Sequence, residues 1–263
     1  MNLDVYTEEM AKSVWDKAFF MDKIPGAKCV IDFGCADGAM IRYLAPLFPT
    51  TTFIGYDINE ELISRASWTA PFHANVHFFM HIEDMIEFVL NIKNFKSHEI
   101  CINFSSVLHE VYSTTGGLYD IVQLQQQLRP KYITIRDMYY DEPPLKFSAL
   151  GKEMKIIEKI EEDRKLAYYA KEFVNKFGFL KTWDNVVHLL MKLQWVDNGW
   201  EDELKEDYFS WTIDKFLTAF DDKYEITFEN RYQLPYLCEK WEQEYGWHNP
   251  EIHTHAQFIL RRV

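Results

Sequence analysis

Short apolar runs alternate with amphipathic segments through the first half of the chain, and this alternation predicts the fold. Five of the runs are too short for buried helices and read as strands, at about residues 29–32, 52–56, 76–80, 100–104 and 132–137. Between them, apolar residues recur at the spacing of one helix face, as they do over 60–68 and 118–128. Strands that alternate with helices are typical of an α/β fold with a mostly parallel sheet.

Helical patterns also flank this region. Residues 7–23 have apolar residues at helical spacing, with Thr7 at the position of an N-terminal cap, and residues 149–220 read as helical throughout. Two more strands are predicted at 224–232 and 256–262, with a helix at 234–244 between them. We therefore divide the chain into an N-terminal helical cap (1–26), a core (27–142), a helical insertion that would serve as a lid (143–221) and C-terminal strands that complete the sheet (222–263).

A tight glycine loop joins the first strand to the helix that follows it. The strand ends at Asp32, and Gly34 and Gly38 bracket the loop, where glycines allow a sharp turn and the close approach of a ligand. A dinucleotide fingerprint would need glycines where Ala36 and Ala39 stand. Asp32 would also repel a pyrophosphate, whereas it would attract an ammonium group.

The second strand ends in an acid as well. Asp57 follows residues 52–56 and lies roughly 20 residues beyond the loop, where a carboxylate binds the ribose hydroxyls of a nucleotide cofactor. A carboxylate suits a diol because its oxygens only accept hydrogen bonds. The loop and the two acids together favour a ligand that carries both a ribose and an ammonium group.

Residues 31–38, I-D-F-G-C-A-D-G, resemble the first motif of the class I S-adenosylmethionine (SAM) dependent methyltransferases, usually h-D-h-G-C-G-x-G with h apolar. The family's middle glycine is Ala36 here, and its methyl group is expected to hold the loop slightly further from the cofactor. The resemblance is good from about residue 28 to residue 137. It implies a Rossmann-like, seven-stranded α/β sheet, mostly parallel with the last strand antiparallel. The helical pattern over 149–220 departs from the minimal fold and indicates a helical insertion after strand 5. The resemblance also implies SAM as cofactor and S-adenosylhomocysteine (SAH) as product.

Carried over by position, the resemblance implies cofactor contacts from the ends of the first four strands. In this family the turn after the third strand contacts adenine, typically through an acid. His81 stands at that place with Glu83 and Asp84 just beyond, and Asp84 fits an early helix-turn acid equally well. The implied cofactor-binding residues are Asp32, Gly34, Cys35, Ala36, Asp37, Gly38, Asp57, Ile58, His81, Ile82, Glu83, Phe104 and Ser105.

A polar cluster follows the fourth strand, at residues 105–113, and packing explains it poorly. Leu108 and His109 resemble a leucine–histidine pair that small-molecule and RNA methyltransferases of this fold often carry in the loop facing cofactor and substrate. His109 suits a general base near neutral pH, and Glu110 would orient it or a cationic substrate. The alternative is a helix N-terminus with serine capping and a buried histidine.

The acceptor would meet residues from several elements at the carboxyl edge of the sheet. Tyr6 and Trp15 would act from the leading helix, which covers either the cofactor or simply the sheet. The predicted catalytic residues are His109, Glu110 and Asp137, and the predicted substrate residues are Tyr6, Trp15, His109, Tyr112, Arg136, Tyr139 and Trp195.

The composition narrows the class of acceptor. The 263 residues carry a net charge of −13, whereas proteins that bind long nucleic acids usually present a basic face. Aromatic residues make up 16% of the chain, which suits a planar or cationic substrate pocket as well as core packing. We therefore favour transfer of a methyl group to oxygen or nitrogen of a small molecule. The alternatives are an RNA or tRNA methyltransferase and a non-methylating, SAM-binding relative.

The remaining patterns concern compartment and metal. Four scattered cysteines, the lack of a basic and then apolar leader, and the lack of a membrane-length apolar run predict a cytoplasmic protein. His248, His253 and His255 raise the question of a metal site, with the last two on one side of a strand. No further ligand lies at a recognised spacing, so no metal is expected.

Overall fold

The computed structural model describes residues 3–5, 7, 12–69, 74–114, 117–140, 154–220, 223–247, 249 and 252–263. The chain forms two compact units, each assembled from separate segments. Residues 2–137, 211–230 and 257–263 contribute to the sheet unit, and residues 138–210 and 231–256 contribute to the helical unit.

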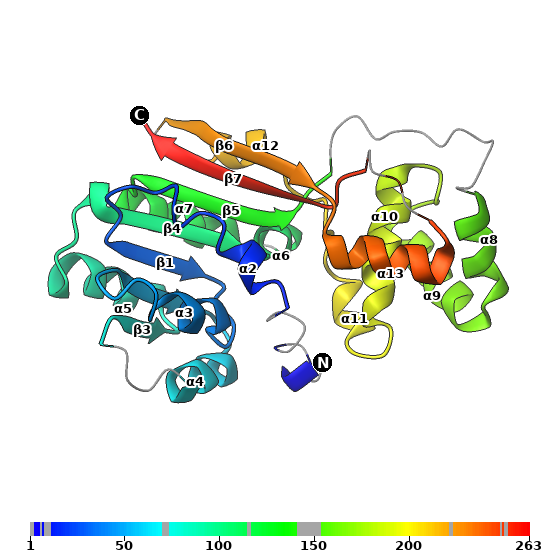
Figure 1. The fold of residues 1–263 in the computed structure, drawn as a ribbon, viewed down its shortest axis with the longest axis horizontal. Helices are drawn as coiled ribbons and strands as arrows, with labels where there is room; N and C mark the ends of the chain where they lie inside the picture. Colours follow the sequence, from blue (N-terminus) through cyan, green and yellow to red (C-terminus); the bar gives the residue numbers. More distant parts are fainter. Residues whose placement is uncertain are drawn as a thin grey trace. The chain divides into compact units, whose positions relative to one another are not determined.

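The sheet has seven strands in the order β3-β2-β1-β4-β5-β7-β6 (Figure 1). The strands are β1 (Cys29–Phe33), β2 (Thr52–Tyr56), β3 (Val76–Phe79), β4 (Ile100–Ser105), β5 (Tyr132–Met138), β6 (Tyr224–Tyr232) and β7 (His255–Arg262). The first five pair in parallel, and β7 runs antiparallel to β5 and β6 (Figure 1). This arrangement confirms the predicted Rossmann-like sheet.

The order of the strands places a switch point between β1 and β4. From β1 the chain moves outward through β2 and β3, and it then returns to β4 on the other side of β1. Ligands of open α/β sheets bind outside the carboxyl ends of the strands at such a point. Every residue of β1 and β4 is buried, because helices cover both faces of a parallel sheet. Asp32 and Asn103 are partners in this central pair.

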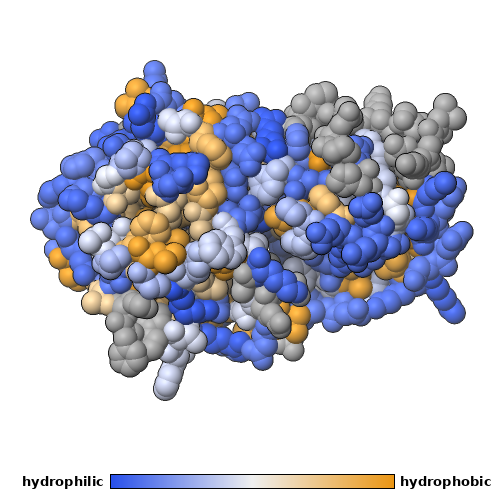
Figure 2. Space-filling view, viewed as in Figure 1, coloured by the Kyte–Doolittle hydropathy of each residue, from blue (hydrophilic) through white to orange (hydrophobic). Residues whose placement is uncertain are grey.

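The helices of the sheet unit include α12 (Ile213–Thr218), which the sequence analysis assigned to the helical insertion. They are α3 (Ala39–Leu44), α4 (Glu60–Thr69), α5 (Ile82–Glu87) with a π-helical continuation over Phe88–Ile92, α6 (Leu108–Ser113), α7 (Gly117–Leu128) and α12 (Ile213–Thr218). Figure 2 shows apolar residues gathered over the sheet on the visible face of this unit.

The later part of the N-terminal segment is less helical than the pattern predicts. Residues 3–5 and 7 are helical, but within 12–23 the chain forms one helical turn, α2 (Val14–Lys17), followed by further turns. The N–H groups of Met21 and Lys23 donate to the carbonyls of Ala18 and Phe20, three residues back. These tight turns place Phe20 in the core with no exposed surface. Burial of this side chain, rather than helical periodicity, decides the conformation.

The helical unit has its own hydrophobic core. Its helices are α8 (Met154–Glu162), α9 (Arg164–Phe177), α10 (Trp183–Lys192), a 3₁₀ turn (Leu193–Trp195), α11 (Trp200–Glu203) and α13 (Pro235–Tyr245). Leu237 and Trp241 of α13 pack with Phe173 of α9 and Leu189 of α10. The helix predicted at 234–244 is therefore part of the same core as the insertion after β5, although the sequence pattern presented the two as separate. Figure 2 shows hydrophilic residues over the outer surface of α8.

A lysine lies inside this helical core. The ammonium of Lys192 has no exposed surface, donates to the carbonyl of Glu203 at 2.5 Å, and lies 3.5 Å from the centre of the Tyr208 ring. The hydroxyl of Tyr208 donates in turn to the carboxylate of Glu203. Burial lowers the pKa of Lys192 to about 8.

Within the described ranges, the helices lack the combination of length and apolarity needed to cross a membrane.

Candidate functional site

The glycine loop after β1 is held by backbone hydrogen bonds to the neighbouring strand. The N–H groups of Gly34 and Cys35 both donate to the carbonyl of Tyr56, at 2.8 and 3.0 Å. Gly38 has φ 75°, in the left-handed region, and a Cβ there would lie 2.7 Å from the Phe78 ring. Only glycine fits this position, because a side chain would be strained and would also clash.

Ala36 occupies the middle of the loop in a conformation that glycine adopts more easily. Its φ is 48°, one of four positive values at non-glycine residues in the described part of the chain. The N–H of Ala36 donates to Asp57 Oδ2 at 2.9 Å. The methyltransferase motif has glycine here, so the alanine carries strain of about 1 kcal/mol that the motif residue would avoid.

Asp57 has hydrogen-bonding capacity left for a ligand. Its Oδ2 accepts from Ala36 N and its Oδ1 from Asn59 N, each at 2.9 Å. A carboxylate offers about four acceptor positions, so about two are left for the hydroxyls of a ribose. Burial raises the pKa of Asp57, and the two N–H bonds oppose this shift by stabilising the charged form.

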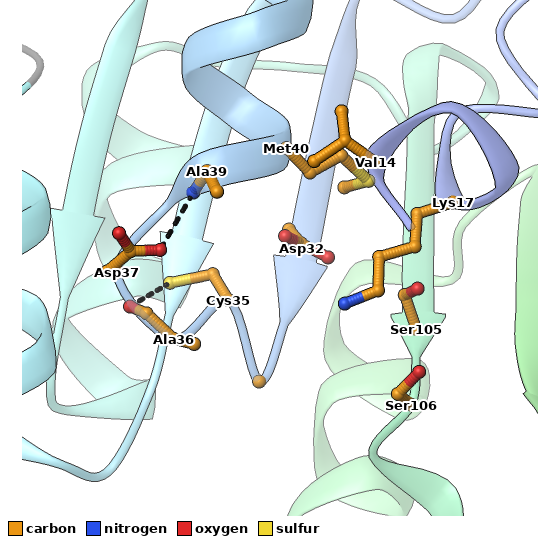
Figure 3. Close-up of a pocket in the computed structure, with 11 residues that line it drawn as sticks. Val14, Lys17, Asp32, Cys35, Ala36, Asp37, Ala39, Met40, Ser105 and Ser106 are labelled. Carbon is orange, nitrogen blue, oxygen red and sulfur yellow. Dashed lines mark hydrogen bonds between the residues drawn. The ribbon is translucent and has the colours of Figure 1, made fainter. Parts of the chain in front are cut away.

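Two cavities adjoin the loop and share Gly34 in their linings. The smaller, of about 40 Å³, is lined by Val14, Lys17, Asp32, Gly34, Cys35, Ala36, Asp37, Ala39, Met40, Ser105 and Ser106 (Figure 3). The larger, of about 200 Å³, is lined by Phe33, Gly34, Tyr56, Asp57, Ile58, Val107, Glu110, Val111, Thr114, Gly117 and Asp120. Three charged side chains line the smaller cavity, Lys17, Asp32 and Asp37. The larger combines three acids, Asp57, Glu110 and Asp120, with apolar side chains that a nucleoside base could contact.

Opposite charges face the smaller cavity. Asp32, at the end of β1, is buried and accepts from Asn103 Nδ2 at 2.8 Å. Burial raises the pKa of Asp32 to about 7, while the Asn103 bond and the charge of Lys17 act in the other direction. Burial lowers the pKa of Lys17 to about 8, and the charge of Arg136 adds to this shift. Burial removes water from both the Asp32 carboxylate and the Lys17 ammonium. A bound group of the opposite charge would stabilise the charged form of each in place of that water.

A buried histidine–aspartate pair lies at the ends of β4 and β5. Nδ1 of His109 is 2.7 Å from Asp137 Oδ1, while Asp137 Oδ2 accepts from the N–H groups of Val107 and Leu108 at 2.9 and 2.6 Å. The carboxylate can only accept, so it fixes the proton of His109 on Nδ1 and leaves Nε2 as the basic nitrogen. Nε2 faces the carboxylate of Glu110, at 4.0 Å.

Most of the predicted cofactor residues line one of the two cavities. Asp32, Gly34, Cys35, Ala36, Asp37 and Ser105 line the smaller cavity, and Gly34, Asp57 and Ile58 line the larger. Gly38 is the N-cap of α3. His81 precedes α5 and is exposed, like Glu83, whereas Ile82 is buried. Phe104 is buried against Phe33 and Phe216. His81, Ile82, Glu83 and Phe104 line neither cavity.

The predicted substrate residues do not form one group. Tyr6 lies outside the described residues, as does His248. Trp15 is 76% exposed and contacts Tyr43. Tyr112 is half-buried on α6, next to the catalytic candidates Glu110 and His109. Arg136 is buried and donates to Asp16 and Ser106. Tyr139 lies under the guanidinium of Arg231, and Trp195 is buried in the helical unit.

Lys17 and Asp120 are the charged lining residues that sequence reasoning missed. Lys17 comes from a segment whose apolar pattern drew attention to Trp15 instead. Asp120 lies in α7 among residues that read as an ordinary amphipathic helix. A charged residue on the apolar side of a short helix, such as Lys17, is the one available signal for a site residue of this kind.

Comparisons with known proteins identify the fold and the family. A family profile for the methyltransferase domain matches residues 6–146. No curated protein sequence matches the chain. The structure of the plantazolicin methyltransferase BamL, in complex with a triazolic desmethylPZN analog and SAH, is 13% identical with a TM-score of 0.51. The match covers 99% of this chain and 88% of that one.

A second solved structure gives the same result. The SAM-dependent methyltransferase from Mesorhizobium loti is 14% identical with a TM-score of 0.51, over 95% of this chain and 97% of that one. At such low identity these two structures show a shared fold, and the family rests on the profile match. That match spans more than half of the 263 residues, and the protein therefore belongs to the class I SAM-dependent methyltransferases.

Proposed function

We propose that this SAM-dependent methyltransferase methylates a hydroxyl group of a small molecule, with His109 as the general base. The observation that supports this most directly is the contact of 2.7 Å between His109 Nδ1 and Asp137 Oδ1, at the carboxyl edge of the sheet. A base is needed where the acceptor must lose a proton to become a good nucleophile, which holds for a hydroxyl. A neutral amine already has a lone pair.

The residues around the loop fit SAM. Ser105 Oγ is buried beside the smaller cavity and has no hydrogen-bond partner among the described residues, so it is available to a polar ligand. In this proposal the amino-acid end of SAM lies in the smaller cavity and its nucleoside in the larger, with the ribose on Asp57. Gly34, common to both linings, would lie where the two halves of the cofactor meet. When bound, SAM supplies a methyl group on a positively charged sulfur.

The proposed reaction is an in-line displacement. The acceptor oxygen forms a bond to the methyl carbon as the bond from that carbon to sulfur breaks, which leaves SAH. The proton of the hydroxyl passes to Nε2 of His109. Asp137 is a positioning residue, because it holds the imidazole in one tautomer and orientation and does not take the proton itself. The rest of the rate enhancement comes from alignment of the two reactants.

A small acceptor is supported by the charge of the chain. A net charge of −13 opposes the approach of a long polyanion such as RNA, since phosphate neutralisation supplies most of the affinity in such complexes. Acceptors to be tested are therefore small alcohols and phenols, matched amines of the same skeleton, and bulk tRNA. Transfer of radiolabelled methyl groups from SAM gives one readout for all three. Label only in tRNA, or only in amines, would contradict the proposal.

The role of His109 is tested with His109→Gln once an acceptor is known. Turnover is expected to fall about 100-fold or more, because general bases contribute about 10²–10⁴ in rate. The dissociation constant for SAH should stay within about twofold. Residual turnover should rise with the fraction of ionised acceptor, so its pH profile should follow the acceptor's own pKa. His98→Gln, on an exposed turn, is the matched control. Full turnover in His109→Gln would show that His109 is not the general base and serves only in packing.

A further inference from the structure

Lys17 is a buried cation that the proposed chemistry does not use. It ends the short helix α2, and its side chain is 9% exposed. Figure 3 shows it reaching from α2 toward the space between Asp32 and Ser105. Val14, on the same turn, lines the same cavity. The one helical turn therefore closes the cavity with one apolar and one cationic side chain.

Polar contacts within the sheet unit fix the position of α2. The carboxylate of Asp16 accepts from Arg136 Nε at 2.6 Å and from Gln257 Nε2 at 2.8 Å. Gln257 Nε2 also donates to the backbone carbonyl of Asp16, at 3.1 Å. Arg136 Nη1 donates to Ser106 Oγ at 2.7 Å. Residues from β5 and β7 thus hold the turn that carries Lys17 in place, so a long and flexible side chain is delivered to a defined location.

The charges around Lys17 come from several elements. The negative ones are Asp32 on β1, Asp137 on β5 and Asp16 on α2, and the positive one is Arg136 on β5. Burial disfavours the charged form of Lys17 and of Asp32, even though the two attract each other. A ligand with a carboxylate and an ammonium group on neighbouring atoms would place a charge of the opposite sign beside each of them.

The amino-acid end of SAM has these two groups. We propose that Lys17 binds the carboxylate of this end of the cofactor while Asp32 faces its ammonium group. The inference rests on the placement of the cofactor proposed above and is independent of the acceptor and of His109. Lys17 then makes α2 part of the cofactor site, and it selects for ligands that keep the carboxylate. A cofactor analogue that lacks only this group should lose the contact to Lys17 and no other.

The test compares ligands that differ in this one group. SAH is compared with decarboxylated SAH, which keeps the ammonium, and with 5′-methylthioadenosine, which lacks both groups. Binding to the full chain is measured by calorimetry at pH 7.5. The parent protein should bind SAH at least about tenfold more tightly than decarboxylated SAH, because a charge-assisted hydrogen bond to a buried carboxylate is among the stronger ones.

Substitution of Lys17 should remove this preference. In Lys17→Met and Lys17→Gln, SAH and decarboxylated SAH should bind within about threefold of each other, and Lys17→Arg should restore much of the difference. Binding of 5′-methylthioadenosine should stay within about twofold throughout, which shows that the loop and Asp57 are intact. Lys23→Met is the matched control, because the Lys23 ammonium binds Asp22 and the Phe19 carbonyl instead.

Two outcomes would overturn the inference about Lys17, and a third would overturn the cofactor placement on which it rests. If the Lys17→Met and Lys17→Gln proteins keep the full preference for SAH, Lys17 does not bind the carboxylate. If the parent has no preference, the carboxylate is not recognised at all. If the parent fails to bind 5′-methylthioadenosine and SAH alike, the proposed cofactor placement itself is wrong.

Discussion

The carboxylate of Asp57 accepts a hydrogen bond of 2.9 Å from the backbone N–H of Ala36, and this bond joins the end of β2 to the middle of the loop after β1. The residue proposed to hold the ribose therefore also holds the loop that approaches the cofactor. A substitution at Asp57 or at Ala36 should therefore alter the conformation of the other residue, because the two contribute to one small region.

Asp57→Asn is expected to weaken cofactor binding. One carboxylate oxygen becomes an NH₂ group, which faces either the N–H of Ala36 or that of Asn59 and cannot accept from either. Loss of a buried acceptor costs about 1–3 kcal/mol, so the dissociation constant for SAH should rise about tenfold or more. Calorimetry measures it. Glu60→Gln, at an exposed acid nearby, is the control and should bind normally. If Asp57→Asn binds SAH with normal affinity, Asp57 holds the loop but does not bind the cofactor.

Ala36→Gly is expected to stabilise the protein. Glycine keeps the N–H that donates to Asp57 and adopts φ 48° with little strain. The gain is offset in part by the greater flexibility of glycine in the unfolded chain, which leaves a net increase of about 0.5 kcal/mol in the free energy of unfolding. Urea unfolding measures this. The matched control Ala39→Gly, at the first residue of α3, should destabilise. If Ala36→Gly and Ala39→Gly destabilise the protein equally, the backbone of Ala36 is not strained.

Lys192 should make the stability of the helical unit depend on pH above neutrality. Its ordinary pKa of 10.5 is lowered by burial to about 8, so between these values the unfolded chain binds a proton that the folded chain does not. This group therefore adds stability as the pH rises from about 8 toward 10.5, up to about 3 kcal/mol. In Lys192→Met the contribution disappears.

The measurement is urea unfolding of both proteins at pH 7.5 and 9.5. The free energy of unfolding of the parent, relative to Lys192→Met, should increase between the two pH values. Lys165→Met serves as control, since Lys165 is exposed and keeps its proton over this range. A parent and a Lys192→Met protein with parallel pH profiles would show that Lys192 keeps its proton in the folded state.

Trp200→Ala should lower stability more than it changes the cofactor site. The indole of Trp200 donates to Glu172 Oε2 at 2.8 Å, contacts the Tyr169 ring and lies in the core of the helical unit. Truncation of such a residue costs about 3–5 kcal/mol. Thermal melts beside SAH binding separate the two effects, and the exposed Trp68→Ala is the control. Unchanged melting with reduced methyl transfer would instead favour a tryptophan that covers the acceptor.

The loop and Asp57 could be predicted because their chemistry is local. Glycines at a strand–helix junction and an acid at the end of the next strand restrict what each position can do, whatever surrounds them. Asp32 was predicted on the same grounds and lines the expected cavity.

Lys17 could not be predicted in this way. Its place depends on Asp16, which is held by Arg136 and Gln257 at separations of 120 and 241 residues. For the same reason, the sequence does not show which segments a predicted helix packs against. The pattern at 234–244 gives an amphipathic helix, but only the folded chain shows that Leu237 and Trp241 complete the core formed by α8 to α10. Contacts between distant segments leave no periodic trace in either segment.

The position of β7 has a consequence for how the protein is made. Of the seven strands of this sheet, β7 is synthesised last, yet it lies inside the sheet, between β5 and β6. Until residues 255–262 emerge, β6 has no neighbour to pair with and the edge of β5 stays open to other chains. The sheet can therefore close only after residues 255–262 have emerged, and a nascent chain that stalls before residue 255 remains prone to aggregation. A stop codon before residue 255 would remove one strand and leave a second without a place in the sheet.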